Sequence, residues 1–169
     1  YLSKTKTFSI YSLSRSNFDL TKTKLLMSYT NKIKPNIIIN CTAYTNVIKA
    51  EFEREKCKKI NINVVRDLCV LANKNNALLL HFSTDFVFDG EKGNYKETNK
   101  TNPINYYGYT KRLGESIISK KLKKYIIIRT SWLYSNNKNN FYSKIIEKIK
   151  DNEILQVVDD QYGFPTSAY

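Results

Sequence analysis

Short apolar runs alternate along this chain with longer stretches in which apolar residues recur every three or four positions. Apolar runs occupy residues 37–39, 77–82 and 125–128, and only the second contains a polar residue, His81. Runs of this kind are typical of strands buried on both faces of a parallel sheet. We expect two further short strands at residues 8–13 and 154–158.

Amphipathic helices are expected between these strands. The longest helical stretch, residues 51–73, places Ile60, Val64, Leu68 and Leu71 on one stripe. Other helices are expected at residues 21–32, 103–120 (starting near Asn105) and 140–150, and the polar residues 89–102, which include Gly90 and Gly93, are expected to form a loop.

This alternation predicts the α/β class, with a Rossmann-like, doubly wound parallel sheet. The 169 residues suffice for one domain with a real core, so we assign residues 1–169 to one domain, an incomplete one for the reasons given below. No apolar run approaches the ~20 residues that a membrane span needs, and we expect no membrane partner.

The net charge of +13 would suit a nucleic-acid-binding protein, but the distribution of the charge argues against it. The excess is mostly lysine spread along the chain, and Lys, Asn, Ile and Tyr share A/T-rich codons. We therefore expect no nucleic-acid partner, although a basic surface would attract an anionic nucleotide. Scattered cysteines (Cys41, Cys57 and Cys69) favour a reduced, cytoplasmic protein, and with a single histidine we expect no metal site.

Polar residues follow three of the predicted strands. They are residues 40–43, 83–85 and 129–132. In doubly wound sheets, ligands bind at the carboxyl ends of the strands, so three such ends suit a dinucleotide cleft. Ordinary turn chemistry would explain any one of them, but explains all three less well.

Tyr107 and Lys111 lie four residues apart on a predicted helix and therefore share one of its faces. A free tyrosine has a pKa near ~10 and is a poor acid–base catalyst at neutral pH. A neighbouring ammonium would favour the phenolate and lower that pKa. The spacing alone favours a plain solvated helix face; the surrounding sequence shifts the balance towards a catalytic pair.

Six segments carry a family resemblance. They are IINCTAYTNV (38–47), HFSTDFVFDG (81–90), NPINYYGYTKRLGE (102–115), IIRTSWLY (127–134), NNF (139–141) and VDDQYGFPTSA (158–168). In order and spacing, from about residue 17 to the end, they resemble the dTDP-4-dehydrorhamnose reductase branch of the extended short-chain dehydrogenase/reductase family.

The resemblance implies a catalytic trio of Thr84, Tyr107 and Lys111. By analogy, Tyr107 gives a proton to the C4 keto oxygen of the sugar and Thr84 hydrogen-bonds that oxygen. Lys111 lowers the pKa of Tyr107 and binds the nicotinamide ribose. Positioned donors of this kind stabilise the negative charge that develops on a keto oxygen as hydride arrives.

The resemblance also implies ligand contacts. On the cofactor side these are Asp19, Leu20, Cys41, Thr42, Ala43, Tyr107 and Lys111, joined by Arg15, which stands where many relatives carry a carboxylate. An arginine there accommodates a 2′-phosphate, so we expect NADPH, with NADH as the alternative. On the sugar side they are Thr84, Asp85, Trp132, Asn140 and residues 161–166. Trp132 has a competing interpretation as a core aromatic, and Asn61 matches a mainly structural asparagine.

Three departures from the family qualify this expectation. The glycine-rich phosphate loop and its strand are absent, and the sequence stops after FPTSA. Ile48 stands where the family has a carboxylate. We therefore expect a sheet without its first strand, poor cofactor affinity, and either a fragment of a longer protein or a truncated product.

The expected function is NADPH-dependent reduction of dTDP-4-dehydro-6-deoxy-L-mannose to dTDP-L-rhamnose, for cell-surface polysaccharide. The expected partner is a dTDP-sugar, and a homodimer is left open. Two alternatives stay open as well: a regulatory subunit of the methionine adenosyltransferase type, and an inactive truncated fragment. A sugar-nucleotide epimerase or dehydratase fits STDFVFDG and RTSWLY less well.

Overall fold

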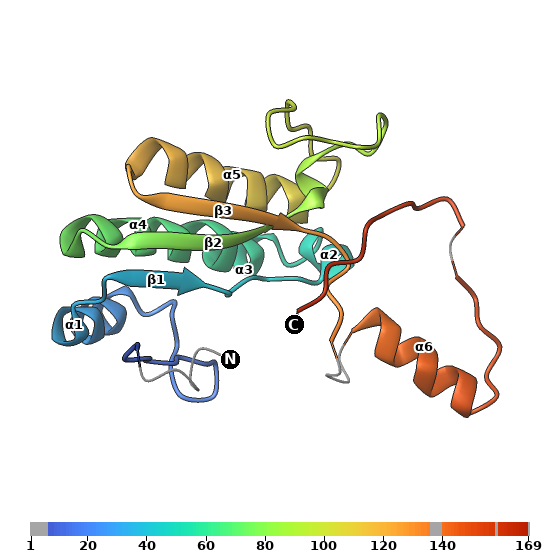
Figure 1. Ribbon diagram of the computed structural model, residues 1–169, viewed down its shortest axis with the longest axis horizontal. Helices are drawn as coiled ribbons and strands as arrows, with labels where there is room; N and C mark the ends of the chain where they lie inside the picture. The colour runs from blue at the N-terminus through green and yellow to red at the C-terminus, as the bar shows by residue number, and fades with distance from the viewer. Residues whose placement is uncertain (1–6, 136–139, 158, 169) are drawn as a thin grey trace.

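Three parallel strands organise the computed structural model, which describes residues 7–135, 140–157 and 159–168 (Figure 1). The strands are β1 (Ile37–Asn40), β2 (Leu78–Thr84) and β3 (Tyr125–Thr130), and they lie side by side in that order. All pairings are parallel, so the carboxyl ends of the strands gather at one edge. The parallel α/β sheet predicted from the apolar runs is confirmed.

Helices and helical turns connect and flank the strands. They are α1 (Thr23–Ile33), α2 (Val47–Ala50), α3 (Arg54–Lys58), the π-helical turn η2 (Lys59–Asn63), α4 (Val64–Asn75), the 3-10 turn η3 (Asp85–Val87), α5 (Tyr106–Lys121) and α6 (Phe141–Lys150). In the parts of the chain that are described, no helix is long and apolar enough to cross a membrane.

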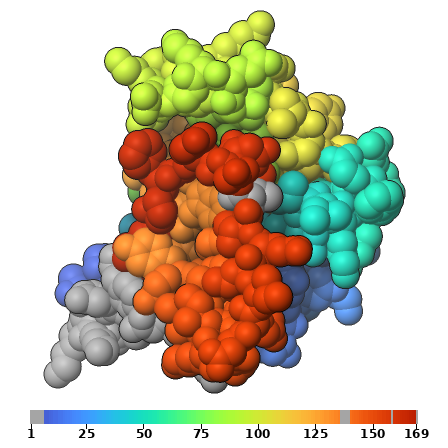
Figure 2. Space-filling view, turned by 90° about the vertical axis from the view of Figure 1, so that its right-hand side faces the viewer, coloured from blue at the N-terminus to red at the C-terminus, as the bar shows by residue number. Residues whose placement is uncertain are grey.

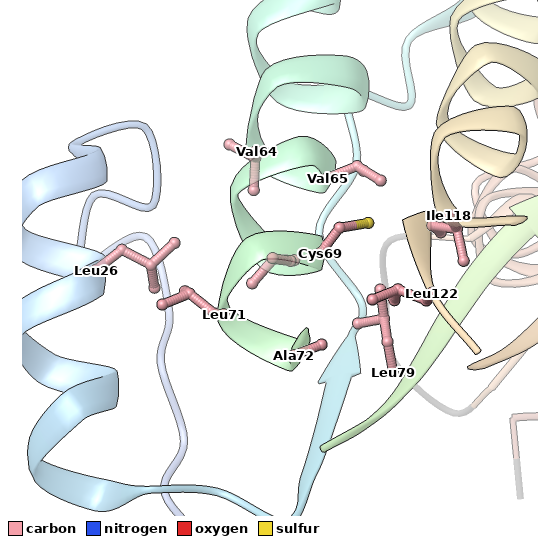
Figure 3. Close-up of a cluster of buried hydrophobic side chains, with 10 residues drawn as sticks. Leu26, Val64, Val65, Cys69, Leu71, Ala72, Leu79, Ile118 and Leu122 are labelled. Carbon is pink, nitrogen blue, oxygen red and sulfur yellow. The ribbon is translucent and has the colours of Figure 1, made fainter. Parts of the chain in front are cut away.

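The main core lies between the sheet and the helices α4 and α5, with α1 packed against α4 (Figure 1). Figure 3 shows side chains of α4 lying between Leu26 of α1 and Leu79 of β2. Leu79 and Ile118 are fully buried there. Burial of such side chains stabilises the fold by about 1.5–3 kcal/mol each. Because Ile118 belongs to α5 and Leu79 to β2, this packing holds α5 against the sheet.

The other face of the sheet carries an apolar row of Ile39, Leu80 and Ile126, which are register partners across the three strands. Ile39 is 46% exposed and Ile126 is 45% exposed. Helix α6 begins with Phe141 and includes Ile149, both exposed, and has no buried residue among those described. Within the described residues, the helices therefore cover one face of the sheet well and leave the second open.

Two predicted strands are not observed. Residues 8–13 run as irregular chain, and so do residues 153–157; Val158, the last residue of the second prediction, lies outside the described residues. A strand needs a neighbouring ladder to satisfy its backbone groups. In the described sheet β1 and β3 each pair only with β2, so their outer edges are free, but neither segment forms a ladder with them.

The long helix predicted over residues 51–73 is also interrupted. It is built from α3, η2 and α4, with the π-helical turn at residues 59–63. The sequence pattern did not reveal the extra residue in this turn, because apolar residues recur at helical spacing both before and after the turn. The interruption matters for the site, since Asn61 lies in that turn.

Candidate active site

The carboxyl end of β2 delivers the first polar group of the site. Thr84 is the last residue of the strand and caps the 3-10 turn η3: its Oγ1 accepts from the Phe86 N–H at 3.2 Å. The same hydroxyl donates to Asp85 Oδ1 at 3.0 Å. The strand end thus fixes both the position and the hydrogen bonding of Thr84, which is buried.

Helix α5 delivers Tyr107 and Lys111. Asn105 caps the helix, with its Oδ1 accepting from the Gly108 N–H at 2.8 Å, so Tyr107 lies in the first turn and Lys111 one turn further on. Gly108 is required because a Cβ there would collide with the Phe86 carbonyl. This close approach brings the start of α5 against η3 and brings Tyr107 to Thr84.

Burial raises the pKa of Tyr107 above its ordinary value, and a hydrogen bond with Thr84 acts in the opposite direction. Asp85 and Cys57 add to the increase. The side chain is only 8% exposed, and its ring packs edge-on against Phe86 at 5.7 Å between centroids. The phenol is therefore held neutral and pointed at Thr84, which suits a proton donor.

Lys111 is nearly completely buried, at 2% exposure. Burial lowers its pKa to about 8, while Glu115 and Cys57 oppose that decrease. Its Nζ donates to the Phe82 carbonyl at 2.6 Å and lies 3.3 Å from His81 Nε2. A lysine with this pKa exchanges protons close to neutral pH, which an exposed lysine does not.

The pairing of Lys111 with Tyr107 differs from the sequence-based expectation. Lys111 was expected to lower the pKa of Tyr107, yet the pKa of Tyr107 is raised and Lys111 is not among the causes of its shift. The largest cause of the Tyr107 shift is burial, and the hydrogen bond of Lys111 Nζ goes to the Phe82 carbonyl at 2.6 Å. The two side chains share a cavity, but burial controls the tyrosine.

A buried polar cluster supports α5 from behind. Asn61, in the π-helical turn, donates to Thr110 Oγ1 at 3.0 Å and accepts from the Tyr44 N–H at 2.8 Å. Cys57 lies 3.3 Å from the same Thr110 hydroxyl. These contacts tie α3, η2 and the loop after β1 to the helix that carries Tyr107 and Lys111, in agreement with a structural role for Asn61.

A cavity of about 270 Å³ joins these groups at the carboxyl ends of the strands. It is lined by Cys41, Ala43, Thr45, Val47, Phe82, Ser83, Thr84, Asp85, Phe86, Tyr107, Lys111, Thr130, Trp132 and Leu133. Figure 2 views the molecule from this end, where the loop around residues 89–102 lies above and α6 and the C-terminal segment lie in front. The three predicted catalytic residues all line this one cavity.

Two observations bear on a cofactor. Ser83 lines the cavity, and its hydroxyl is buried without a hydrogen-bond partner among the described residues. A buried orphan hydroxyl favours a polar ligand beside it. The cavity is smaller than the ~300–1,000 Å³ of most ligand pockets, so it fits the reacting end of a dinucleotide better than the whole molecule.

The predicted cofactor residues are only partly brought together. Cys41 and Ala43 line the cavity, and Arg15 lies beside them, with its Nη2 donating to the Ala43 carbonyl at 3.2 Å. Asp19 accepts from the backbone and hydroxyl of Thr21 and stabilises a turn. The other predicted contact on this segment, Leu20, packs against the main core and does not line the cavity.

On the predicted sugar side, Asp85 and Trp132 line the cavity and Asn140 does not. Asn140 caps α6, with its Oδ1 accepting from the Ser143 N–H at 2.9 Å. Trp132 is 40% exposed, so it is not a buried core aromatic. Of residues 161–166, Gly163 lies against the Trp132 ring and Thr166 hydrogen-bonds the Ser131 carbonyl at 3.0 Å.

Asn40 was expected at the site only as one of the polar residues 40–43 that follow a strand, and its partner His81 was not assigned to the site from the sequence. They are register partners on β1 and β2, and Asn40 Nδ2 lies 2.9 Å from His81 Nδ1. Both are buried. A polar residue near the end of each of two neighbouring apolar strands was the available signal, since such residues meet in a parallel sheet.

Fold and site together define a class: a Rossmann-like α/β domain with a threonine, a tyrosine and a lysine in one cavity at the carboxyl ends of its strands. A scan against protein families matches residues 2–169 to the RmlD substrate binding domain. The chain belongs to that family. The resemblance stated from the sequence motifs is therefore confirmed at the level of the family.

Individual relatives agree. The chain is 40% identical over 160 residues to a dTDP-4-dehydrorhamnose reductase of Aggregatibacter actinomycetemcomitans, covering 94% of this chain and 54% of that protein. It is 42% identical over 137 residues to the Escherichia coli K12 enzyme of the same name, covering 80% of this chain and 46% of the relative. The chain thus spans about half the length of the curated relatives it matches.

Solved structures give the same result. The crystal structure of the Bacillus anthracis dTDP-4-dehydrorhamnose reductase in complex with NADP superposes with a TM-score of 0.91 at 38% identity, covering 95% of this chain and 57% of that one. The Clostridium acetobutylicum protein of that name superposes with a TM-score of 0.92 at 37% identity, covering 98% and 59%. The fold of the described residues is therefore that of this family.

Proposed function

We propose that this chain carries the acid–base half of an NADPH-dependent reductase that converts dTDP-4-dehydro-6-deoxy-L-mannose to dTDP-L-rhamnose. The observation that carries the proposal is the single cavity in which Thr84, Tyr107 and Lys111 meet. The names of the relatives at 40% and 42% identity support the substrate class. Those relatives are named as reductases, which favours this function over a regulatory subunit.

Each residue has a role that its environment supports. Tyr107 is held neutral by burial and faces Thr84, so it can give a proton to a keto oxygen bound between the two hydroxyls. Thr84 donates to that oxygen and stabilises the charge that develops on it. The charged form of Lys111, whose pKa is about 8, can restore the proton that Tyr107 has given up.

We propose NADPH as the reductant; when bound, it supplies the hydride. Ser83, Cys41, Ala43 and Lys111 would hold its reacting end, since they line the cavity. Arg15, at the Ala43 carbonyl, is available for a 2′-phosphate. A relative of 38% identity whose crystal structure is a complex with NADP supports this choice.

A cytoplasmic location and a homodimer are further parts of the proposal. The three cysteines are free: Cys57 and Cys69 are buried and Cys41 is exposed, as a reducing compartment allows. The open apolar face of the sheet offers a surface on which a second subunit could pack.

Exchange of the proton donor tests the proposed reaction. NADPH oxidation with the dTDP-4-keto sugar is measured for the longest natural protein that contains this chain, as wild type, Tyr107→Phe and Tyr106→Phe. Loss of a positioned acid typically costs ~10²–10⁴-fold, so Tyr107→Phe should lose most activity. Tyr106 is the matched control, because its ring stacks with Arg54 away from the cavity. Equal rates in both variants would rule out Tyr107 as the donor.

A further inference from the structure

A continuous chain of buried hydrogen bonds runs from the loop after β1 to Lys111. The Thr42 N–H donates to Asn40 Oδ1 at 2.9 Å, and Asn40 Nδ2 lies 2.9 Å from His81 Nδ1. On the far side of the imidazole, His81 Nε2 lies 3.3 Å from Lys111 Nζ. Asn40, His81 and Lys111 are 3%, 1% and 2% exposed, so all three are shielded from bulk water.

The donor and acceptor roles along this series of hydrogen bonds are set by the bond between Thr42 and Asn40. A backbone N–H can only donate, so the oxygen of the Asn40 amide must face Thr42 and the NH₂ group must face His81. The NH₂ group donates, so His81 Nδ1 must accept. A neutral imidazole that accepts at Nδ1 carries its proton on Nε2. Backbone geometry therefore selects the Nε2–H tautomer of His81.

This tautomer points a donor at Lys111. An ammonium has three donors and no lone pair, so a charged Lys111 opposes the His81 Nε2–H across 3.3 Å. The opposite tautomer would move the conflict to Asn40 and Thr42, where two N–H groups would face each other. A backbone N–H cannot lose its proton, whereas Lys111 can. The mismatch is relieved by loss of a proton from Lys111, whose free lone pair then accepts from His81.

We propose that Asn40 and His81 are positioning residues that set the proton affinity of Lys111: they present it with a hydrogen-bond donor and so favour its neutral amine. In that state Nζ accepts from His81 Nε2–H and donates to the Phe82 carbonyl. The loop after β1, which contributes Cys41 and Ala43 to the cavity, is thereby coupled to the charge of Lys111.

The other groups around Lys111 act in the opposite sense or on other partners. Glu115, one turn along α5, and Cys57, from α3, both favour the charged lysine. Tyr107 faces Thr84 and Asp85 rather than the imidazole. Burial and Lys111 lower the pKa of His81 to about 3, which agrees with a ring that stays neutral. His81 is therefore the one group of this set that offers Lys111 a donor.

The role of these hydrogen bonds in catalysis rests on the proposed reductase function, whereas the tautomer of His81 can be measured without it. His81 is the only histidine of the 169 residues, so its imidazole ¹⁵N signals need no assignment. ¹⁵N NMR of the isotope-labelled chain at pH 6–9 should show a protonated Nε2 and an unprotonated Nδ1. A protonated Nδ1, or a ring that titrates near ~6.5 in the folded chain, would overturn the proposal.

Asn40→Asp reverses the chain of bonds. One carboxylate oxygen can still accept from the Thr42 N–H, while the other accepts from a proton on His81 Nδ1. The tautomer should switch, and the Lys111 titration, followed by its ¹³Cε shift and identified by its loss in Lys111→Arg, should move up from about 8. Thr42→Ala, which keeps the backbone N–H, should change neither signal.

An unchanged His81 tautomer in a folded Asn40→Asp chain would refute the proposal, and so would a tautomer switch that leaves the Lys111 titration in place. Neither measurement uses substrate or cofactor. A failure here therefore leaves the reductase proposal standing, and failure of the Tyr107→Phe test leaves this inference standing.

Discussion

At the scale of single residues, the site relies on burial more than on charge pairing. Tyr107, Lys111 and His81 all have pKa values shifted in the direction that disfavours their charged forms, and burial is the largest cause for each. Such neutral, buried groups transfer protons well but reduce stability, because the unfolded chain ionises them freely. The site should therefore leave a pH signature in the free energy of unfolding.

His81 makes that signature measurable. Its pKa is about 3 in the folded chain against an ordinary 6.5. Between pH 3 and pH 6.5, His81 is therefore protonated in the unfolded state and neutral in the folded state. Stability should consequently fall as the pH decreases through this window, by at most about 1.4 kcal/mol per pH unit from this group. Urea unfolding between pH 7 and 4.5 should give a shallower slope for His81→Gln than for the wild type.

The carboxylates titrate in the same window, but both proteins share them, so they cancel in the comparison. Equal slopes for the wild type and His81→Gln would contradict the buried, neutral state of His81.

At the scale of elements, the important contact is between η3 and the start of α5. Gly108→Ala places a methyl group against the Phe86 carbonyl, which is backbone and cannot rotate away. Glycine to alanine in a helix normally stabilises by ~0.5–1 kcal/mol, but overpacking here should cost about 1–3 kcal/mol and move Tyr107. Thermal unfolding measures the cost. Ser119→Ala, at an exposed position of α5, should stay within ~0.5 kcal/mol of the wild type.

Strand β3 is joined to α5 by an ion pair. Arg129 Nε and Nη2 donate to the two oxygens of Glu115 at 3.0 and 2.7 Å, and Glu115 is buried. Arg129→Met leaves that carboxylate unpaired and should cost about 3–5 kcal/mol. The double variant with Glu115→Gln should recover part of the loss, as chemical denaturation can show. If the loss of stability in the double variant equals the sum of the losses in the two single variants, the pair is not coupled.

The elements also show how far sequence reasoning reaches. The apolar runs at residues 37–39, 77–82 and 125–128 predicted the three observed strands, and the helix predicted over residues 103–120 was expected to start near Asn105, as observed. Residues 8–13 have the composition of a strand but pair with no strand of the described sheet. Pairing depends on the neighbouring strands, which composition does not specify. The four-residue spacing of Tyr107 and Lys111 predicted that these two side chains lie on one face of a helix, and both line the cavity. It did not predict the partners of Lys111, because His81 and Phe82 come from another element.

At the scale of the whole molecule, the open face of the sheet should govern behaviour in solution. The row of Ile39, Leu80 and Ile126 is partly exposed, as is the edge of β1 that pairs with no described residue. Apolar faces and free edges of this kind promote association.

The 169-residue chain should therefore associate with increasing concentration in sedimentation experiments. Ile39→Lys, which places a charge on the face, should reduce this association. Ile48→Lys is the control: Ile48 is 76% exposed but lies on α2, away from the sheet. If both variants reduce association equally, the sheet face is not the cause.

The π-helical turn has a consequence for rotation about the helix axis. Each residue of an α-helix turns the chain by about 100°, so the extra residue in η2 sets α3 and α4 out of phase with each other. Cys57 and Asn61 can therefore both face Thr110 while Leu68 and Leu71 of α4 face the core. Deleting one residue from η2 would restore regular α-helical winding. The helix could then keep either the contacts of Cys57 and Asn61 with Thr110 or the packing of Leu68 and Leu71 in the core, but not both.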